Sequence, residues 1–125
     1  MKKNDLTKRI EFDTLKPVHW FLAAKNFVSS LPDEVRRDFG FLIYRLQRGD
    51  KLGMPYSRPM NIVSSGVSEL RVRGLDGHFR LMYFTKSKAG IFVFHGFIKK
   101  TQTTSIDEIK LGRSRLKDLL ENGNE

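Results

Sequence analysis

Three strand-like segments follow one another between residues 67 and 98, and they leave the chain few choices of fold. In the first of them, apolar Leu70 and Val72 alternate with charged residues, which is the period of a strand with one buried face. The two connections are short and contain glycines, which tolerate the positive φ of tight turns. The segments are VSELRVR (67–73), HFRLMYF (78–84) and IFVFHGFI (91–98), joined by GLDG (74–77) and TKSKAG (85–90).

Helical patterns flank these strands. Between Pro32 and Gly49 apolar residues recur at intervals of three and four, which predicts a helix with one buried stripe. Proline in the first turn and glycine at the end are typical of helix boundaries. Ser105 followed by Glu108 forms a capping-box pattern ahead of a second helix that reaches Leu120.

The remaining segments complete a predicted order of β-α-α-β-β-β-α. VHWFL after Pro17 is a candidate first strand, AKNFVSSL is expected to form a helical turn or two, and residues 50–66 are expected to form a surface loop. Because no βαβ alternation occurs, we expect the α+β class, with a small antiparallel sheet packed by helices. The strand over 91–98 is apolar on both faces and is expected at the centre of the sheet.

The length of 125 residues suits a single domain. Residues 1–15 are polar and lack sustained periodicity, so we expect a flexible N-terminal arm ahead of a folded domain over residues 16–122. Cysteine is absent, and the apolar runs are far shorter than the roughly 20 residues of a membrane span. We therefore expect a cytoplasmic protein that does not bind membranes.

The chain is strongly basic. Its 23 Lys and Arg residues exceed its 14 Asp and Glu residues, which gives a formal net charge of +9. Eight basic residues and only two acidic ones lie between positions 58 and 100, within the predicted sheet region. Such an excess suits a polyanionic partner such as nucleic acid. The alternative is a basic surface that serves only solubility.

Arginines gather on one face of the first predicted hairpin. Strand alternation places Arg71 and Arg73 together, and the GLDG turn can bring Arg80 beside them. Like charges repel, so such a cluster indicates an anion site. The alternative is a solvated face, or pairing with Glu69. The candidates for RNA or phosphate contacts are Arg58, Arg71, Arg73 and Lys86.

The end of the last predicted strand adds a histidine and two lysines. His95 lies in an apolar segment, where a histidine is either a hydrogen-bonded core residue or a general acid or base. Lys99 and Lys100 are either solvent-exposed side chains where the chain leaves the sheet, or groups that stabilise the negative charge of a transition state. The catalytic candidates are Arg80, His95, Lys99 and Lys100.

This set of residues suits RNA cleavage without a metal, because the RNA 2′-hydroxyl supplies the nucleophile. Glu69, Asp76 and His78 are too scattered for a metal site, so we expect neither a metal nor another cofactor. The chain also lacks the GxxxxGK[ST] loop of nucleotide hydrolases and the GxSxG elbow of esterases.

Four stretches taken together resemble the phage-related branch of the RelE/HigB-like toxins, within the RelE/ParE superfamily. The resemblance runs from about Pro17 to Leu120. It implies a RelE-like fold and the toxin of a type II toxin–antitoxin pair, neutralised by a cognate antitoxin that is often of the helix-turn-helix type. It also implies an endoribonuclease that cleaves mRNA, commonly at the ribosome. The stretches are PVHWF (17–21), LPDEVRRDFGFLIYRLQRG (31–49), SELRVRGLDGHFRLMYF (68–84) and IFVFHGFIKKTQTTSIDEI (91–109).

The resemblance also implies roles for individual residues. Arg80 matches the arginine of a YR-x-x-Y segment, although Phe79 stands in place of the first tyrosine, and it would stabilise the phosphate and the transition state. Lys99 or Lys100, from an HGF-x-KK element, would transfer a proton or neutralise phosphate. ParE-type relatives poison DNA gyrase without cutting RNA, which leaves two alternatives. These are a non-enzymatic inhibitor of gyrase or another target, and a plain RNA-binding module.

Overall fold

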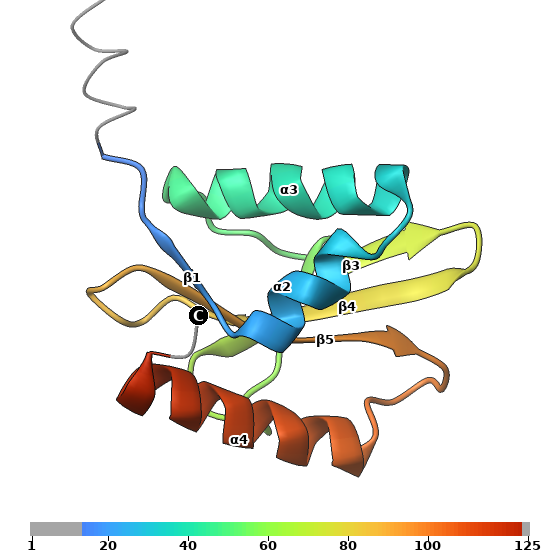
Figure 1. Cartoon of the computed structure of the whole chain (residues 1–125). Coiled ribbons are helices and arrows are strands. Elements are labelled where there is room, and N and C mark those ends of the chain that lie inside the picture. Colours follow the sequence, from blue (N-terminus) through green and yellow to red (C-terminus); the bar gives the residue numbers. More distant parts are fainter. Residues whose placement is uncertain (1–13, 124–125) are drawn as a thin grey trace, which may run out of the picture.

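A five-stranded sheet with helices on both faces forms the described part of the protein (Figure 1). The computed structural model describes residues 14–123, so the predicted arm over 1–15 lies outside it except for its last two residues. The predicted α+β class is confirmed. In chain order the elements are β1 (Val18–Trp20), α2 (Leu22–Ser29), α3 (Asp33–Gln47), β2 (Ser57–Pro59), β3 (Val67–Gly74), β4 (Gly77–Phe84), β5 (Ile91–Lys99) and α4 (Ile106–Asn122).

The strand order is β1-β5-β4-β3-β2, and it departs from the prediction in two ways. The sheet is mixed, because β1 pairs with β5 in parallel while the other pairs are antiparallel. The central strand is β4, and β5 lies beside it between β4 and β1. Strand β5 is apolar on both faces because helices cover the sheet on each side, and that burial does not require the middle position.

Strand β2 lies within the segment predicted to be a loop. It has only three residues, and one of them is a proline, so no period of two can be read from the sequence. It forms because β3 offers a free edge, with Ser57 paired to Leu70. The buried hydroxyl of Ser57 also lies 2.6 Å from the hydroxyl of Tyr83, a hydrogen bond that ties β2 to the sheet.

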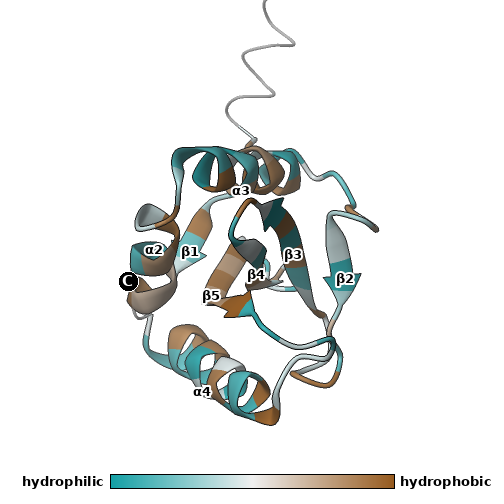
Figure 2. Cartoon of the chain, turned by 90° about the vertical axis from the view of Figure 1, so that its right-hand side faces the viewer, coloured by the Kyte–Doolittle hydropathy of each residue, from teal (hydrophilic) through white to brown (hydrophobic). Residues whose placement is uncertain are grey.

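Each face of the sheet has its own apolar core (Figure 2). Helices α2 and α3 cover the face that carries Leu70 and Leu81. Helix α4 covers the opposite face, where Met82 and Phe94 are buried. The register shifts between Met82 and Tyr83, so Met82 pairs with His95 and Tyr83 with Val93. This bulge places two consecutive side chains of β5, Phe94 and His95, on the α4 face.

Both predicted helices are present, and their ends lie within two residues of the expected positions. Helix α3 begins after Pro32, and two acidic residues lie in its first turn. Helix α4 is capped by Ser105, whose Oγ accepts a hydrogen bond from the backbone N–H of Glu108, and it ends at Gly123 with a positive φ of 61°. Within residues 14–123, no helix is both long and apolar enough to cross a membrane.

Candidate functional site

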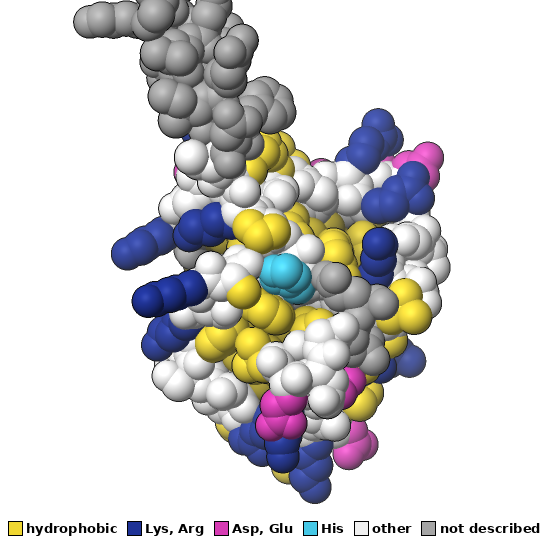
Figure 3. Space-filling model, turned by 60° about the vertical axis from the view of Figure 1, so that its left-hand side comes forward, with side chains coloured by type: hydrophobic (Ala, Val, Ile, Leu, Met, Phe, Trp, Pro, Cys, Tyr) yellow, Lys and Arg dark blue, Asp and Glu magenta, His cyan; other side chains and the backbone are white. Residues whose placement is uncertain are grey.

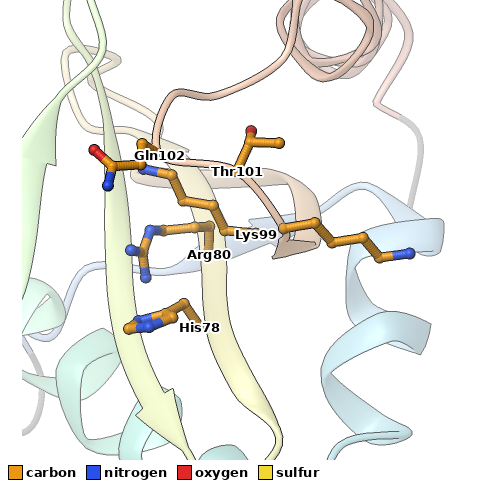
Figure 4. Close-up of a pocket in the computed structure, with 6 residues that line it drawn as sticks. His78, Arg80, Lys99, Thr101 and Gln102 are labelled. Atoms are coloured by element: carbon orange, nitrogen blue, oxygen red, sulfur yellow. The ribbon is translucent and has the colours of Figure 1, made fainter.

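The strand register gathers basic side chains on the α4 side of the sheet. Arg71 of β3 lies opposite Arg80 of β4, and His78 of β4 lies opposite Lys99 of β5. Figure 4 shows His78 and Arg80 extending from β4 toward the same side, near Lys99. These side chains line an open depression of about 420 Å³ whose walls come from β4, β5 and the segment after β5. We call Arg58, Arg71, Arg80 and Lys99 the basic cluster.

A buried ion pair lies at the centre of the basic cluster. Arg80 is 4% exposed, and its Nε lies 3.6 Å from Oε1 of Glu69, which has no exposed surface. Arg80 Nη1 donates to the carbonyl of Phe79 at 3.1 Å. Neither carboxylate oxygen of Glu69 nor Arg80 Nε has a hydrogen-bond partner among the described residues. The Arg80 guanidinium is therefore not fully used by hydrogen bonds within the described residues, and the Glu69 carboxylate lies close enough to interact with its charge.

Burial shifts the pKa of both members of this pair. It raises the pKa of Glu69, against the opposing effect of the Arg80 charge. It also lowers the pKa of Arg80, and the charge of Arg71 acts in the same direction. An arginine remains protonated in proteins even so. Arg80 is thus a permanent cation in a poorly solvated position, where its attraction for an added phosphate is less screened by water.

Lys99 lies at the rim of the same face. Burial lowers the pKa of its ammonium group; Glu69 opposes this effect, while Arg80 and Arg71 reinforce it. A lysine with a lowered pKa gives up a proton more readily, which suits proton transfer. Lys100 follows the end of β5 and is exposed. Both lysines also line a second depression of about 320 Å³ near the start of α4.

His95 lies under α4, away from the open depression. It is 2% exposed, its Nδ1 lies 2.8 Å from Nη1 of Arg115, and its Nε2 lies 3.1 Å from Oε1 of Glu108. Because a guanidinium only donates, Nδ1 is the acceptor and Nε2 carries the proton that is donated to Glu108. Burial lowers the pKa of His95, although the hydrogen bond to Glu108 opposes this. This geometry is that of a hydrogen-bonded core histidine, with both ring nitrogens occupied.

The other predicted contact residues are distributed unevenly. Arg58 pairs in register with Glu69, and its charge acts on both Glu69 and Lys99. Arg73 is exposed near the tip of the hairpin. Lys86, in contrast, packs against Gly66 in the turn after β4. Six residues of extended chain, roughly 20 Å, separate it from Arg80. The structure therefore does not bring Lys86 into the basic cluster.

Positive charge alone does not locate this site. Figure 3 shows lysine and arginine side chains projecting from the β1 side of the molecule as well. What distinguishes the basic cluster is the combination of burial, the Glu69 carboxylate and an open depression. In residues 14–123, the His, Asp and Glu side chains form no group of three that could hold a metal ion.

Two residues of this region were not predicted from the sequence. The sequence singled out His78 only as a metal-binding type of residue without nearby partners. The short turn between β3 and β4 places it opposite Arg73 on one side and Lys99 on the other. The hairpin register could have revealed this position. Arg115 was not singled out, although it contacts His95. Its spacing of seven from Glu108 places both on one helix face, but no local signal indicates which strand that face covers.

Comparison with known proteins gives one family match. The model of the family described as "Phage derived protein Gp49-like (DUF891)" matches residues 26–117, which is most of the chain. A search of curated proteins finds no match. The matched range contains α3, strands β2 to β5 and most of α4. It therefore includes every residue of the basic cluster.

Proposed function

We propose that this chain, which belongs to the Gp49-like family of phage-derived proteins, is a RelE/HigB-like toxin that cleaves mRNA at the ribosome. The family is associated with type II toxin–antitoxin pairs. The observation that carries the nuclease proposal is the position of Lys99 beside the buried Arg80 on an open face of the sheet. A proton-transfer group next to a poorly solvated cation favours phosphodiester cleavage, because the first moves a proton and the second stabilises the added negative charge.

The proposed reaction uses the RNA as its own nucleophile. The 2′-hydroxyl attacks the adjacent phosphorus, the bond to the 5′-oxygen of the next nucleotide breaks, and a 2′,3′-cyclic phosphate and a 5′-hydroxyl result. Arg80 stabilises the added negative charge on the phosphoryl oxygens. Lys99, with its lowered pKa, accepts the proton of the attacking 2′-hydroxyl or donates a proton to the leaving 5′-oxygen, and water makes the other transfer. Arg58 and Arg71 bind neighbouring phosphates, and no metal takes part.

The proposal includes two macromolecular partners. The first is the ribosome, which presents the mRNA codon to the basic cluster. The second is a cognate antitoxin, a small protein of the helix-turn-helix type, which keeps the toxin inactive. A gene for such a protein next to the gene for this chain is expected. Its product should co-purify with the chain and restore growth when both are expressed together.

The test is induced expression in a bacterium, read by growth and by mapping transcript 5′ ends. The variant Arg58→Ala/Lys99→Ala removes two charges from the basic cluster. The matched control Lys86→Ala/Lys88→Ala removes two exposed charges from the turn between β4 and β5. We expect new 5′ ends, in frame within coding regions, for wild type and the control and not for the cluster variant.

The alternatives give different results in the same experiment. Growth arrest with intact transcripts would refute the nuclease proposal and point to gyrase, which supercoiling of a reporter plasmid would then test. Normal growth with intact transcripts, together with RNA binding by the purified chain, would leave a plain RNA-binding module. Loss of cleavage in both double variants would show that total charge matters and that the basic cluster has no special role.

A further inference from the structure

A groove lies at the outer edge of β3, around the corner from the basic cluster. It has a volume of about 270 Å³ and is bounded by α3, β3 and the turn that precedes β2. Strand β2 pairs with β3 only over residues 68–70, and the following β3 residues, 71–73, line this groove. The lining residues are Asp38, Phe41, Leu42, Arg45, Tyr56, Arg71, Val72 and Arg73.

Two exposed aromatic side chains, those of Phe41 and Tyr56, line the groove, whereas the exposed ring of Tyr44 lies outside it on α3. Phe41 is 61% exposed on α3, although Leu42 beside it is buried. Tyr56 is 50% exposed, although Ser57 beside it is buried. Neither ring belongs to either apolar core. Large rings left in solvent around one concave site indicate a surface that binds a flat partner.

Arg71 connects the groove to the basic cluster. Its backbone N–H donates to the carbonyl of Tyr56 at 2.8 Å, which fixes Tyr56 beside β3. Its side chain lines the groove, and its charge also acts on Glu69 and Arg80. The Nε of Arg71 is buried and has no hydrogen-bond partner among the described residues. The groove therefore begins where the basic cluster ends.

From this arrangement we propose that the groove binds one unstacked base of a single-stranded RNA whose backbone lies on the basic cluster. This inference rests on the proposed function. Single-stranded nucleic acids bind where a basic surface meets aromatic rings on which bases stack. The volume lies just below the range of about 300–1,000 Å³ for sites of drug-sized ligands, which suits one base. Asp38 and Arg73 add an acceptor and donors, which match the polar edge of a base better than an aliphatic side chain.

Fluorescence anisotropy with the purified full chain tests this proposal. The probes are a labelled single-stranded 2′-O-methyl RNA, which lacks the attacking hydroxyl, and the same backbone with abasic positions. The variant is Phe41→Ala/Tyr56→Ala, and the matched control Ile62→Ala/Leu75→Ala shortens two exposed apolar side chains outside the groove. Tyr56→Phe keeps the ring. Thermal unfolding confirms that each variant is folded.

We expect the groove variant to bind the base-containing probe roughly tenfold more weakly than wild type, within the range for one stacked base. Tyr56→Phe and the control should bind like wild type. The abasic probe should bind wild type and the groove variant equally, because it has no base to stack. The slope of log K against log salt should be unchanged, since the groove variant removes no charge.

Three results would overturn the proposal. Equal binding of the base-containing probe to wild type and the groove variant would show that the groove takes no base, while salt-dependent binding would leave the basic cluster and the proposed function intact. Loss of antitoxin binding with RNA affinity unchanged would assign the groove to a protein partner. No RNA binding by wild type would remove the premise itself, and the transcript-mapping experiment would then decide the proposed function separately.

Discussion

The substitution His95→Ala separates a structural role of this histidine from a catalytic one. It removes an acceptor from Arg115 at 2.8 Å and a donor to Glu108 at 3.1 Å. Hydrogen bonds to charged groups contribute about 1.5–3 kcal/mol each. Glu108 keeps access to water with 28% of its side chain exposed, which places its loss at the low end. We therefore expect His95→Ala to lower the free energy of unfolding by about 3–5 kcal/mol.

Urea denaturation measures this loss, with the m-value as a control for two-state unfolding. A domain of this size has a stability of about 5–15 kcal/mol, so the variant should remain folded at low temperature. A double-mutant cycle with Glu108→Ala should give a coupling of about 0.5–3 kcal/mol, because the two side chains are in direct contact.

Two outcomes would refute this reasoning. The first is a His95→Ala protein with wild-type stability, which would mean that the two hydrogen bonds to α4 contribute nothing. The second is a folded variant that has lost mRNA cleavage at a temperature where its folded fraction is complete. That result would make His95 a catalytic residue despite its burial. Cleavage at a near wild-type rate under those conditions would establish the structural role.

The contacts of β5 and α4 can be tested by three further measurements. Burial lowers the pKa of His95 in the folded protein below the ordinary value of 6.5, so the unfolded chain binds this proton first as the pH falls. The free energy of unfolding of wild type should therefore decline below about pH 6.5. Urea titrations at about pH 5–8 measure this decline, and His95→Ala should lack the part that His95 contributes. Gly96→Ala should destabilise the protein by about 1–3 kcal/mol, because its Cβ would overlap the ring of Phe27. Adding Phe27→Ala in the same chain should make the two effects non-additive in thermal unfolding. Ser105→Ala should cost about 1 kcal/mol by leaving the Glu108 N–H without its cap, whereas Ser105→Asp should cost little, as guanidinium denaturation would report.

Elements whose causes are local could be predicted from the sequence alone. The alternation in residues 67–73, the glycine turns and the capping box are set by neighbours a few positions apart, and the corresponding strands and helices were predicted from them. The same alternation, with the GLDG turn, placed Arg71 and Arg73 on one face and brought Arg80 beside them, which located two members of the basic cluster, Arg71 and Arg80.

Pairing between distant segments was decided only by the tertiary structure. Strand β2 has three residues and no readable period, and the free edge of β3 makes it a strand. The parallel pairing of β1 with β5 likewise depends on where α2 and α3 return the chain.

The role of His95 shows the same division most clearly. The sequence placed it correctly in a buried strand but left two interpretations open, because a strand pattern does not specify which helix covers the strand. Only the bulge in β5 and the packing of α4 place Glu108 and Arg115 against its two ring nitrogens. Local periodicity defines which face a side chain occupies, whereas its hydrogen-bond partners, and with them its chemistry, depend on contacts between segments far apart in the chain.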